Sequence, residues 1–368
     1  IRMGKIYTAL GLMSGTSMDG VDVSIIKSDG YSQFSNILDD YYEFDNELHE
    51  RLLSLRNSIT TKENLIEFSK ELKILERDLT LFHSKVVNKT SSKFIDKIDL
   101  LGFHGQTIFH NPEIKISKQL GDGNLLSQLT QKNVIYNFRQ NDLKNGGEGA
   151  PLSPIFHKLL VKKLVKEKKI KTPITILNIG GIANATFVDK NYDITSMDIG
   201  PGNCLIDKWI RVNSDKNFDN NGETAKSGKI DKFILEQSLD NYYNNKISKK
   251  KSLDINDFDI SFARGLSLEN GARTITEFTA DIISKKIFNN DIYVCGGGRK
   301  NHFLINLIKL RIKNNIEKID DIGIDGDFIE SQAFGYLAIR SFLKLPISFP
   351  ETTGCIEPSV GGVIVDNY

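Results

Sequence analysis

Cysteine is scarce in this chain of 368 residues, which has only Cys204, Cys295 and Cys355. No two of them form a C-x-x-C pair or a zinc-ligand spacing, so disulfide bonds and zinc sites are not expected. The six histidines include no H-E-x-x-H motif, and they predict no metal centre. No apolar run has the length of a transmembrane helix or the form of a signal-peptide core. We therefore expect a chain that stays in the reducing cytoplasm.

Neither sign of charge is in excess, because 48 Lys and Arg residues face 47 Asp and Glu residues. This balance gives no reason to expect nucleic acid or an acidic membrane as a partner. A small molecule is the expected partner, and a homodimer is one option for the assembly. With 368 residues, the chain is long for a single hydrophobic core, so two domains are predicted.

The two common phosphate-binding motifs are missing from the most glycine-rich stretch near the start, GLMSGTSMDGVDVSII at residues 11–26. It has no Lys followed by Ser or Thr, as a Walker loop needs, and no G-x-G-x-x-G leading into a helix. The residues after Gly20 alternate and are β-branched, which predicts a strand. The unit is strand, glycine loop, strand. Such a loop is either an ordinary hairpin turn or a cradle for phosphates built from backbone N–H groups and hydroxyls.

The same pattern returns twice. ITILNIGGIANATF, at residues 174–187, predicts a second glycine hairpin, and DIYVCGGGRKNHFLINLIKLRI predicts a strand, a glycine turn and a helix. Between them, Asp198 ends a short predicted strand, and Gly200–Gly202 lead into a helix that starts near Asn203. A carboxylate beside a helix N-terminus suits catalysis. The alternative is an Asp that only caps the turn.

Longer elements frame these turns. Apolar residues at three- and four-residue steps predict one amphipathic helix over residues 63–90. Strands are predicted over 98–110 and 133–143, and Pro154 starts a predicted helix. The helix FIESQAFGYLAIRSFL carries Glu330 near its start, either as a ligand-facing group or as a carboxylate favoured by the helix dipole.

The ordered motifs GLMSGTSMDGVD, GFHGQTIFH, NFRQNDLKNGGEGAPL, NIGGIANAT, DIGPGNCLID, CGGGRKN and ESQAFGYLA resemble the anhydro-N-acetylmuramic acid kinase family. That family belongs to the actin, hexokinase and Hsp70-like ATPase superfamily. The resemblance runs nearly from end to end. It departs at NGGEGAPL, where Asn145 and Glu148 replace the expected Ala and Gln.

The resemblance implies an α/β fold with two ribonuclease-H-like lobes, and with ATP and sugar bound in the cleft between them. The expected first lobe comprises residues 1–140 and 342–368, and the expected second lobe comprises residues 141–341. The implied reaction hydrolytically opens the 1,6-anhydro bond of anhydro-N-acetylmuramic acid and phosphorylates its 6-oxygen. Alternatives on the same scaffold are a conventional sugar kinase, a glycoside hydrolase or a non-catalytic nucleotide-dependent sugar sensor.

The resemblance also implies roles for single residues. Asp198 is expected to deprotonate the attacking water, and Glu330 to position sugar or water. The expected cofactors are ATP and Mg²⁺, with Asp19 holding the metal through water. The expected nucleotide contacts are Gly15, Thr16, Ser17, Met18, Asp19, Gly20, Val21, Asp22, Gly180, Gly181, Gly200, Gly202, Gly296, Gly297, Gly298 and Asn301. The expected sugar contacts are His104, Gln106, Thr107, Arg139 and Asp142, with the Arg139 guanidinium matching the lactyl carboxylate.

Overall fold

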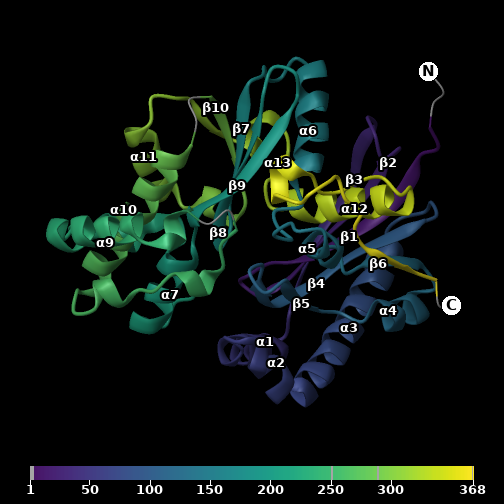
Figure 1. The fold of residues 1–368 in the computed structure, drawn as a ribbon, viewed down its shortest axis with the longest axis horizontal. Helices are drawn as coiled ribbons and strands as arrows, with labels where there is room; N and C mark the ends of the chain where they lie inside the picture. Colours follow the sequence, from purple (N-terminus) through teal and green to yellow (C-terminus); the bar gives the residue numbers. More distant parts are fainter. Residues whose placement is uncertain (1–3, 250–251, 288–289, 367) are drawn as a thin grey trace. The chain divides into compact units, whose positions relative to one another are not determined.

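The computed structural model of the chain describes residues 4–249, 252–287, 290–366 and 368. These residues form two compact units, each with its own sheet (Figure 1). The first unit comprises the chain up to Ile170 together with Phe328–Tyr368, and the second comprises Lys171–Asp327. Both ends of the chain therefore belong to the first unit.

The first unit is built on a sheet with the strand order β12-β6-β4-β1-β2-β3, and β5 also pairs with β4. Strand β2 is antiparallel to its neighbours β1 and β3, and β4 and β6 run parallel to β1. The strands are β1 (Tyr7–Ser14), β2 (Gly20–Ser28), β3 (Phe34–Glu43), β4 (Leu100–Asn111), β5 (Ile116–Leu120), β6 (Asn133–Tyr136) and β12 (Val363–Val365).

The second unit repeats this plan with a sheet of order β11-β10-β7-β8-β9. Strand β8 is antiparallel to its neighbours β7 and β9, and β10 and β11 run parallel to β7. The order β3-β2-β1-β4-β6 therefore corresponds strand for strand to β9-β8-β7-β10-β11, which confirms the predicted pair of ribonuclease-H-like lobes. The strands are β7 (Ile174–Ile179), β8 (Ile182–Val188), β9 (Ile194–Pro201), β10 (Asp291–Cys295) and β11 (Ile316–Lys318).

Helices cover both faces of the first sheet. The buried residues of α1 and α3 share one apolar cluster with β1, β2 and β4, while α12, drawn in yellow in Figure 1, contacts the same strands. Gly11 and Gly102 allow α12 to approach closely, because a Cβ on either would lie within 2.2 Å of a backbone oxygen of that helix. The helices are α1 (Asn46–Ser58), α2 (Lys62–Glu67), α3 (Ser69–Ser91), α4 (Gly123–Thr130), α5 (Gln140–Lys144), α6 (Pro154–Lys166), α12 (Ile329–Phe342) and α13 (Pro350–Thr353).

The helices of the second unit pack around a separate apolar core that includes Trp209, Phe278 and Ile292. They are α7 (Cys204–Asn213), α8 (Glu223–Ser227), α9 (Lys232–Asn244), α10 (Leu268–Lys286) and α11 (His302–Arg311). Short 3₁₀ turns span Asn220–Gly222, Lys246–Lys249, Ile255–Asp257, Ser261–Ala263, Gly297–Lys300 and Ile319–Ile322. Among the described residues, no helix combines the length and apolarity needed to cross a bilayer.

Three sequence expectations differ from the structure. The helix predicted over 63–90 is two helices, because the backbone leaves the helical region at Phe68. The strand predicted over 133–143 ends at Tyr136, since Asn137 has a φ of 57° and the chain turns into α5. The expected lobe boundaries assigned α6 and most of α12 to the second lobe, whereas both helices belong to the first unit. Contacts of α12 with β1, β2 and β4, and of α6 with β3, account for that placement.

Candidate active site

The first glycine loop joins β1 to β2, and side chains from strands of the first sheet hold it by hydrogen bonds. Ser14 Oγ donates to Gly20 O at 2.8 Å and to Gln106 Oε1 at 2.6 Å, and Gln106 Nε2 donates to Gly15 O at 3.0 Å. Met18, with a φ of 55°, turns its buried side chain into the core. A Cβ on Gly15 would meet no atom closer than 3.9 Å. The loop is therefore fixed at its base and open at Gly15.

The exposed part of the loop offers polar groups. Thr16, Ser17 and Asp19 are exposed, and Ser17 Oγ donates to Asp19 Oδ1 at 2.7 Å. Among the described residues, no group of three or more His, Cys, Asp or Glu side chains forms a metal cage. A single carboxylate fits Mg²⁺ that keeps several waters and is carried mainly by phosphates. It does not fit a protein-held metal centre.

A second polar group of the first unit surrounds Arg139. Its Nη1 donates to Gly149 O at 2.8 Å, and its Nη2 lies 2.9 Å from His104 Nε2. His104 Nδ1 lies 2.7 Å from Gly105 O, so the ring donates from Nδ1 and accepts at Nε2. Burial, with the charge of Arg139 in addition, lowers the pKa of His104 well below its ordinary value. His104 is therefore a neutral group that orients Arg139.

Glu330 lies in the first turn of α12. Burial raises the pKa of this carboxyl group, and the positive charge of Arg139 opposes that rise. Glu330 and Arg139 come from distant parts of the sequence but belong to the same unit. A carboxyl group and a guanidinium that influence one another in this way are suited to holding a polar ligand.

The two remaining sugar candidates support the backbone around this group. Asp142 is buried, and its carboxylate accepts from Gly149 N at 2.7 Å and from Thr353 Oγ1 at 2.6 Å. It thus holds the NGGEGAPL loop, whose Gly149 carbonyl binds Arg139. Thr107 Oγ1 accepts from Gln119 Nε2 at 3.2 Å. A cavity of about 480 Å³ borders His104 and Gln119, and its lining does not include Arg139 or Glu330.

In the second unit, two of the predicted glycine turns are hydrogen-bonded to one another. Gly202 N donates to Gly181 O at 2.9 Å, and Asn203 N donates to Gly180 O at 2.8 Å. A Cβ on Gly202 would lie 2.2 Å from Gly180 O, so only glycine permits this approach. The turns meet where α7 begins. The N–H groups of Gly202, Asn203 and Cys204 are thus already donated to carbonyls of the Gly180–Gly181 turn, and what favours an anion here is the positive end of the α7 dipole.

The third glycine turn lies beside the first of these. Gly296, with a φ of 77°, comes so close to the end of β7 that a Cβ would lie 2.2 Å from Asn178 Oδ1. Gly297, in contrast, faces open space. Since β7 and β10 are parallel neighbours, their turns emerge at the same edge of the sheet. Asn301 caps α11, because its side chain accepts from Leu304 N at 3.0 Å.

Asp198 lies inside β9, three residues before the strand ends, rather than at its last position. It pairs with Asn184 next to an irregularity between Ala183 and Asn184, and such bulges re-aim side chains beside active sites. Its buried carboxylate accepts from Leu253 N at 2.7 Å. The negative charge of Asp198 also opposes the fall that burial causes in the pKa of Lys286. Asp198 is therefore a buried, oriented carboxylate on the strand that leads into the turns.

The structure thus separates the predicted residues into two sets. The sugar candidates, Glu330 and the first glycine loop belong to the first unit, while Asp198 and the other turns belong to the second. Val21 and Met18 lie in the core, so their side chains cannot contact a ligand, and the Met18 backbone is already bonded to Gly15 O and His49 Nδ1. Sequence reasoning missed Ser14, which holds the first loop together with Gln106. No local pattern indicates that pairing, since 92 positions separate the two residues.

Two ribonuclease-H-like units, each with a glycine turn after its first strand, define the fold class of the actin and hexokinase type. The comparisons with known proteins narrow this class. The family model for anhydro-N-acetylmuramic acid kinase matches residues 7–367. The anhydro-N-acetylmuramic acid kinase of Pelagibacter ubique is 52% identical over 379 residues, covering 100% of both chains. That of Agrobacterium fabrum is 36% identical over 378 residues, covering 99% of this chain and 100% of the relative.

A third relative, the anhydro-N-acetylmuramic acid kinase of Rhizobium johnstonii, is 38% identical over 379 residues and covers 98% of this chain and 99% of its own. The chain belongs to the anhydro-N-acetylmuramic acid kinase family. The resemblance that the motifs indicated is confirmed, and so is the enzyme class, a phosphotransferase that acts on a sugar.

Proposed function

We propose that this chain uses ATP and water to open the 1,6-anhydro bond of anhydro-N-acetylmuramic acid, and that it phosphorylates the 6-oxygen released. The products are N-acetylmuramic acid 6-phosphate and ADP, which places the enzyme in the recycling of cell-wall sugars in the cytoplasm. The observation that carries the proposal is the buried Asp198 on the strand that leads into the hydrogen-bonded glycine turns. Membership of the kinase family supports it.

The substrate explains why a carboxylate is needed. In an anhydro sugar the 6-oxygen is bonded to the anomeric carbon, so it has no proton for an ordinary kinase base to remove. Asp198 instead takes a proton from water, and the water oxygen bonds to the anomeric carbon as the bond to the 6-oxygen breaks. The 6-oxygen then bonds to the γ-phosphorus, and ADP leaves. The phosphoryl group thus replaces the general acid of a glycosidase.

The glycine turns account for ATP binding. The first loop, from Gly15 to Asp22, offers backbone N–H groups and the hydroxyls of Thr16 and Ser17 to the phosphates. The turns at Gly180 and Gly200 lie beside the start of α7, whose dipole favours the phosphates, and the turn at Gly296 receives the adenosine. Bound Mg²⁺ supplies neutralisation of the phosphate charge, with Asp19 beside its water shell.

The Arg139 group accounts for the sugar. The Arg139 guanidinium pairs with the lactyl carboxylate, because two of its N–H groups are already oriented by His104 and Gly149. Glu330 positions the sugar or the water. Gln106 contributes by joining the sugar-side strand β4 to the first loop. Asp142 and Thr107 contribute through the neighbouring groups that they hold.

Mass spectrometry of the product tests the proposal. Anhydro-N-acetylmuramic acid incubated with the enzyme, ATP and Mg²⁺ is expected to give N-acetylmuramic acid 6-phosphate, and omission of ATP is expected to leave the substrate intact. Ring opening without ATP would indicate a glycoside hydrolase. Phosphorylation of glucosamine-type sugars in preference to the anhydro sugar would indicate a conventional sugar kinase. If the anhydro sugar does not increase ADP release, the protein is a sensor rather than an enzyme.

A further inference from the structure

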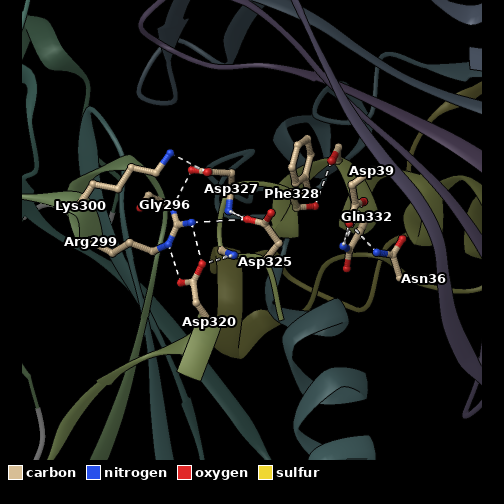
Figure 2. Close-up of polar contacts among 12 residues, drawn as sticks. Asn36, Asp39, Gly296, Arg299, Lys300, Asp320, Asp325, Asp327, Phe328 and Gln332 are labelled. Atoms are coloured by element: carbon tan, nitrogen blue, oxygen red, sulfur yellow. Dashed lines mark hydrogen bonds and ion pairs between the residues drawn. The ribbon is translucent and has the colours of Figure 1, made fainter. Parts of the chain in front are cut away.

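Arg299, the residue that follows the third glycine turn, has a guanidinium group surrounded by acceptors (Figure 2). Its Nε and Nη2 donate to the two carboxylate oxygens of Asp320 at 2.7 and 2.9 Å. Its Nη1 donates to Asp327 Oδ1 at 2.6 Å and to Gly296 O at 3.2 Å. A longer contact of 3.4 Å joins Nη2 to Asp325 Oδ1. The Arg299 side chain is 5% exposed and lies in the interior of the second unit, whereas the side chains of Asp320, Asp325 and Asp327 are 36%, 50% and 31% exposed.

The backbone around Arg299 is arranged to fit this group. Gly296 N donates to Gly326 O at 3.0 Å, which joins the glycine turn directly to the segment 320–327. A Cβ on Gly326 would lie 2.5 Å from Arg299 Nε, so the segment passes flat against the guanidinium. Arg299 therefore fastens the turn to this segment by a side-chain contact next to a main-chain contact.

The contacts of Arg299 also argue against a direct role in binding phosphate. An arginine in a nucleotide site often pairs with phosphate through its planar set of donors. Here the donors on all three nitrogens are directed to carboxylates and to Gly296 O. Asp320 and Asp327 both have a lowered pKa with Arg299 among the causes, so the guanidinium lies among ionised partners. Its charge is used within the protein.

We propose that Arg299 is a positioning residue for the nucleotide: it holds the Gly296–Gly298 turn in the form that receives the adenosine and does not itself contact ATP. This inference rests on the proposed function, which assigns the turn to ATP. Gly296 and Gly298 are packed against Asn178 and Ile179, whereas Gly297 faces open space. By holding the turn, the Arg299 contacts fix the position of Gly297, the turn residue that faces open space.

The test is the steady-state kinetics of Arg299→Lys, with ATP varied at saturating sugar. Lysine keeps the charge but lacks the planar fork, so it cannot satisfy Asp320 at two points and Asp327 and Gly296 O as well. We expect the KM for ATP to rise about tenfold, while kcat and the KM for the sugar change less than about twofold, because only nucleotide placement is affected. Calorimetric ATP affinity should fall by a similar factor.

Arg311→Lys is the matched control. It makes the same change in the same unit, at a residue that pairs with Glu277 and lies on α11, and it should leave the KM for ATP unchanged. Asp320→Asn serves as the second variant if Arg299→Lys does not fold, since it removes only one charged partner. It is expected to raise the KM for ATP several-fold, as a weakened second support would.

The outcomes separate a positioning role from a purely structural one. If Arg299→Lys or Asp320→Asn lowers the melting temperature but leaves the KM for ATP of the folded fraction at the wild-type value, the inference is overturned. A fall in kcat with an unchanged KM for ATP overturns it as well. If the wild-type protein shows no sugar-dependent release of ADP, the proposed function fails, and the assignment on which the inference rests fails with it.

Discussion

The two units share the order and direction of five strands but use them differently. In the first unit, the hairpin loop between β1 and β2 is held by Gln106 and exposes hydroxyls and a carboxylate. In the second, the corresponding hairpin turn at Gly180 is hydrogen-bonded to the turn that starts α7. The same scaffold thus gives one loop that is open to a ligand and one that is part of a packed assembly of turns. The strands determine where the loops are, and the residues within each loop determine its chemistry.

The units also differ in their buried ionisable groups. The first holds His83, His104, His110 and His157, all with a pKa lowered by burial. The second contains a single histidine, His302, which is exposed. It instead buries the side chains of Asp198, Asp219, Glu277 and Arg299. The first unit is therefore expected to be sensitive to acid, while the second has no buried histidine among the residues described.

The largest expected effect is the loss of turnover on removal of the Asp198 carboxylate in the second unit. Asp198→Asn keeps the size of the side chain and an oxygen for the Leu253 N–H, but removes the base. We expect kcat to fall about 10²- to 10⁴-fold, as is typical for loss of a general base, with the affinities for ATP and sugar nearly intact. Ring opening and phosphoryl transfer should fall together.

Asp193→Asn is the control, because Asp193 is an exposed carboxylate just before the same strand. Turnover is normalised to folded protein, and calorimetry gives the two affinities. Near-normal turnover of Asp198→Asn would remove Asp198 from the mechanism. A loss of stability with unchanged turnover per folded molecule would assign it a structural role.

Acid should unfold the first unit before the second. Burial lowers the pKa of His157 to about 3 and that of His83 to about 4, against an ordinary 6.5. Below pH 6.5 the unfolded chain binds protons that these rings do not accept in the fold, so the free energy of unfolding decreases as the pH falls. At pH 5 each ring lowers the free energy of unfolding by about 2 kcal/mol.

Hydrogen exchange at pH 7 and pH 5 measures the acid effect unit by unit. Protection should fall first in the segments of the first unit, and His157→Gln should reduce the fall, whereas His302→Gln should not alter it. Equal losses in both units would contradict the account of the buried histidines.

A smaller effect is expected at the open loop. Gly15→Val places its side chain in open space, so the melting temperature should stay near that of the wild type. The KM for ATP should rise by about tenfold or more, because the branched side chain occupies the place of a phosphate. Gly20→Val, in contrast, should lower the melting temperature, since its Cβ would lie 2.5 Å from Tyr42 O. Unchanged ATP affinity in folded Gly15→Val protein would mean that the loop does not bind phosphate.

Much of this comparison could be predicted from local patterns. The hairpins at Gly15 and Gly180, the helix that begins at Pro154 and the turn at Gly296 follow from alternation, glycine and proline. The break at Phe68 could not be predicted, because the apolar spacing continues across it. The end of β6 was missed as well, since β5 takes the place beside β4, and strand competition of this kind is not local.

The candidate site was predictable as a set of residues but not as a set of contacts. Asp142 was expected to bind sugar, yet its carboxylate holds Gly149 N and Thr353 Oγ1. Arg299 directly follows a glycine turn that was expected to contact the nucleotide, yet its donors are directed to carboxylates 21 to 28 positions further along the chain. A motif specifies which side chains are present. Which partner each one takes depends on residues brought together only by the fold.

The route of water tests the central claim most directly. Turnover in oxygen-18 water, quenched early and analysed by mass spectrometry, should place the label on the anomeric hydroxyl and leave the phosphate ester oxygen unlabelled. Product incubated in the same water without turnover corrects for spontaneous exchange. The proposed mechanism requires this pattern, because Asp198 activates water toward the anomeric carbon and the 6-oxygen stays with the sugar. Label in released inorganic phosphate, with none on the anomeric hydroxyl, would show simple ATP hydrolysis and contradict the account.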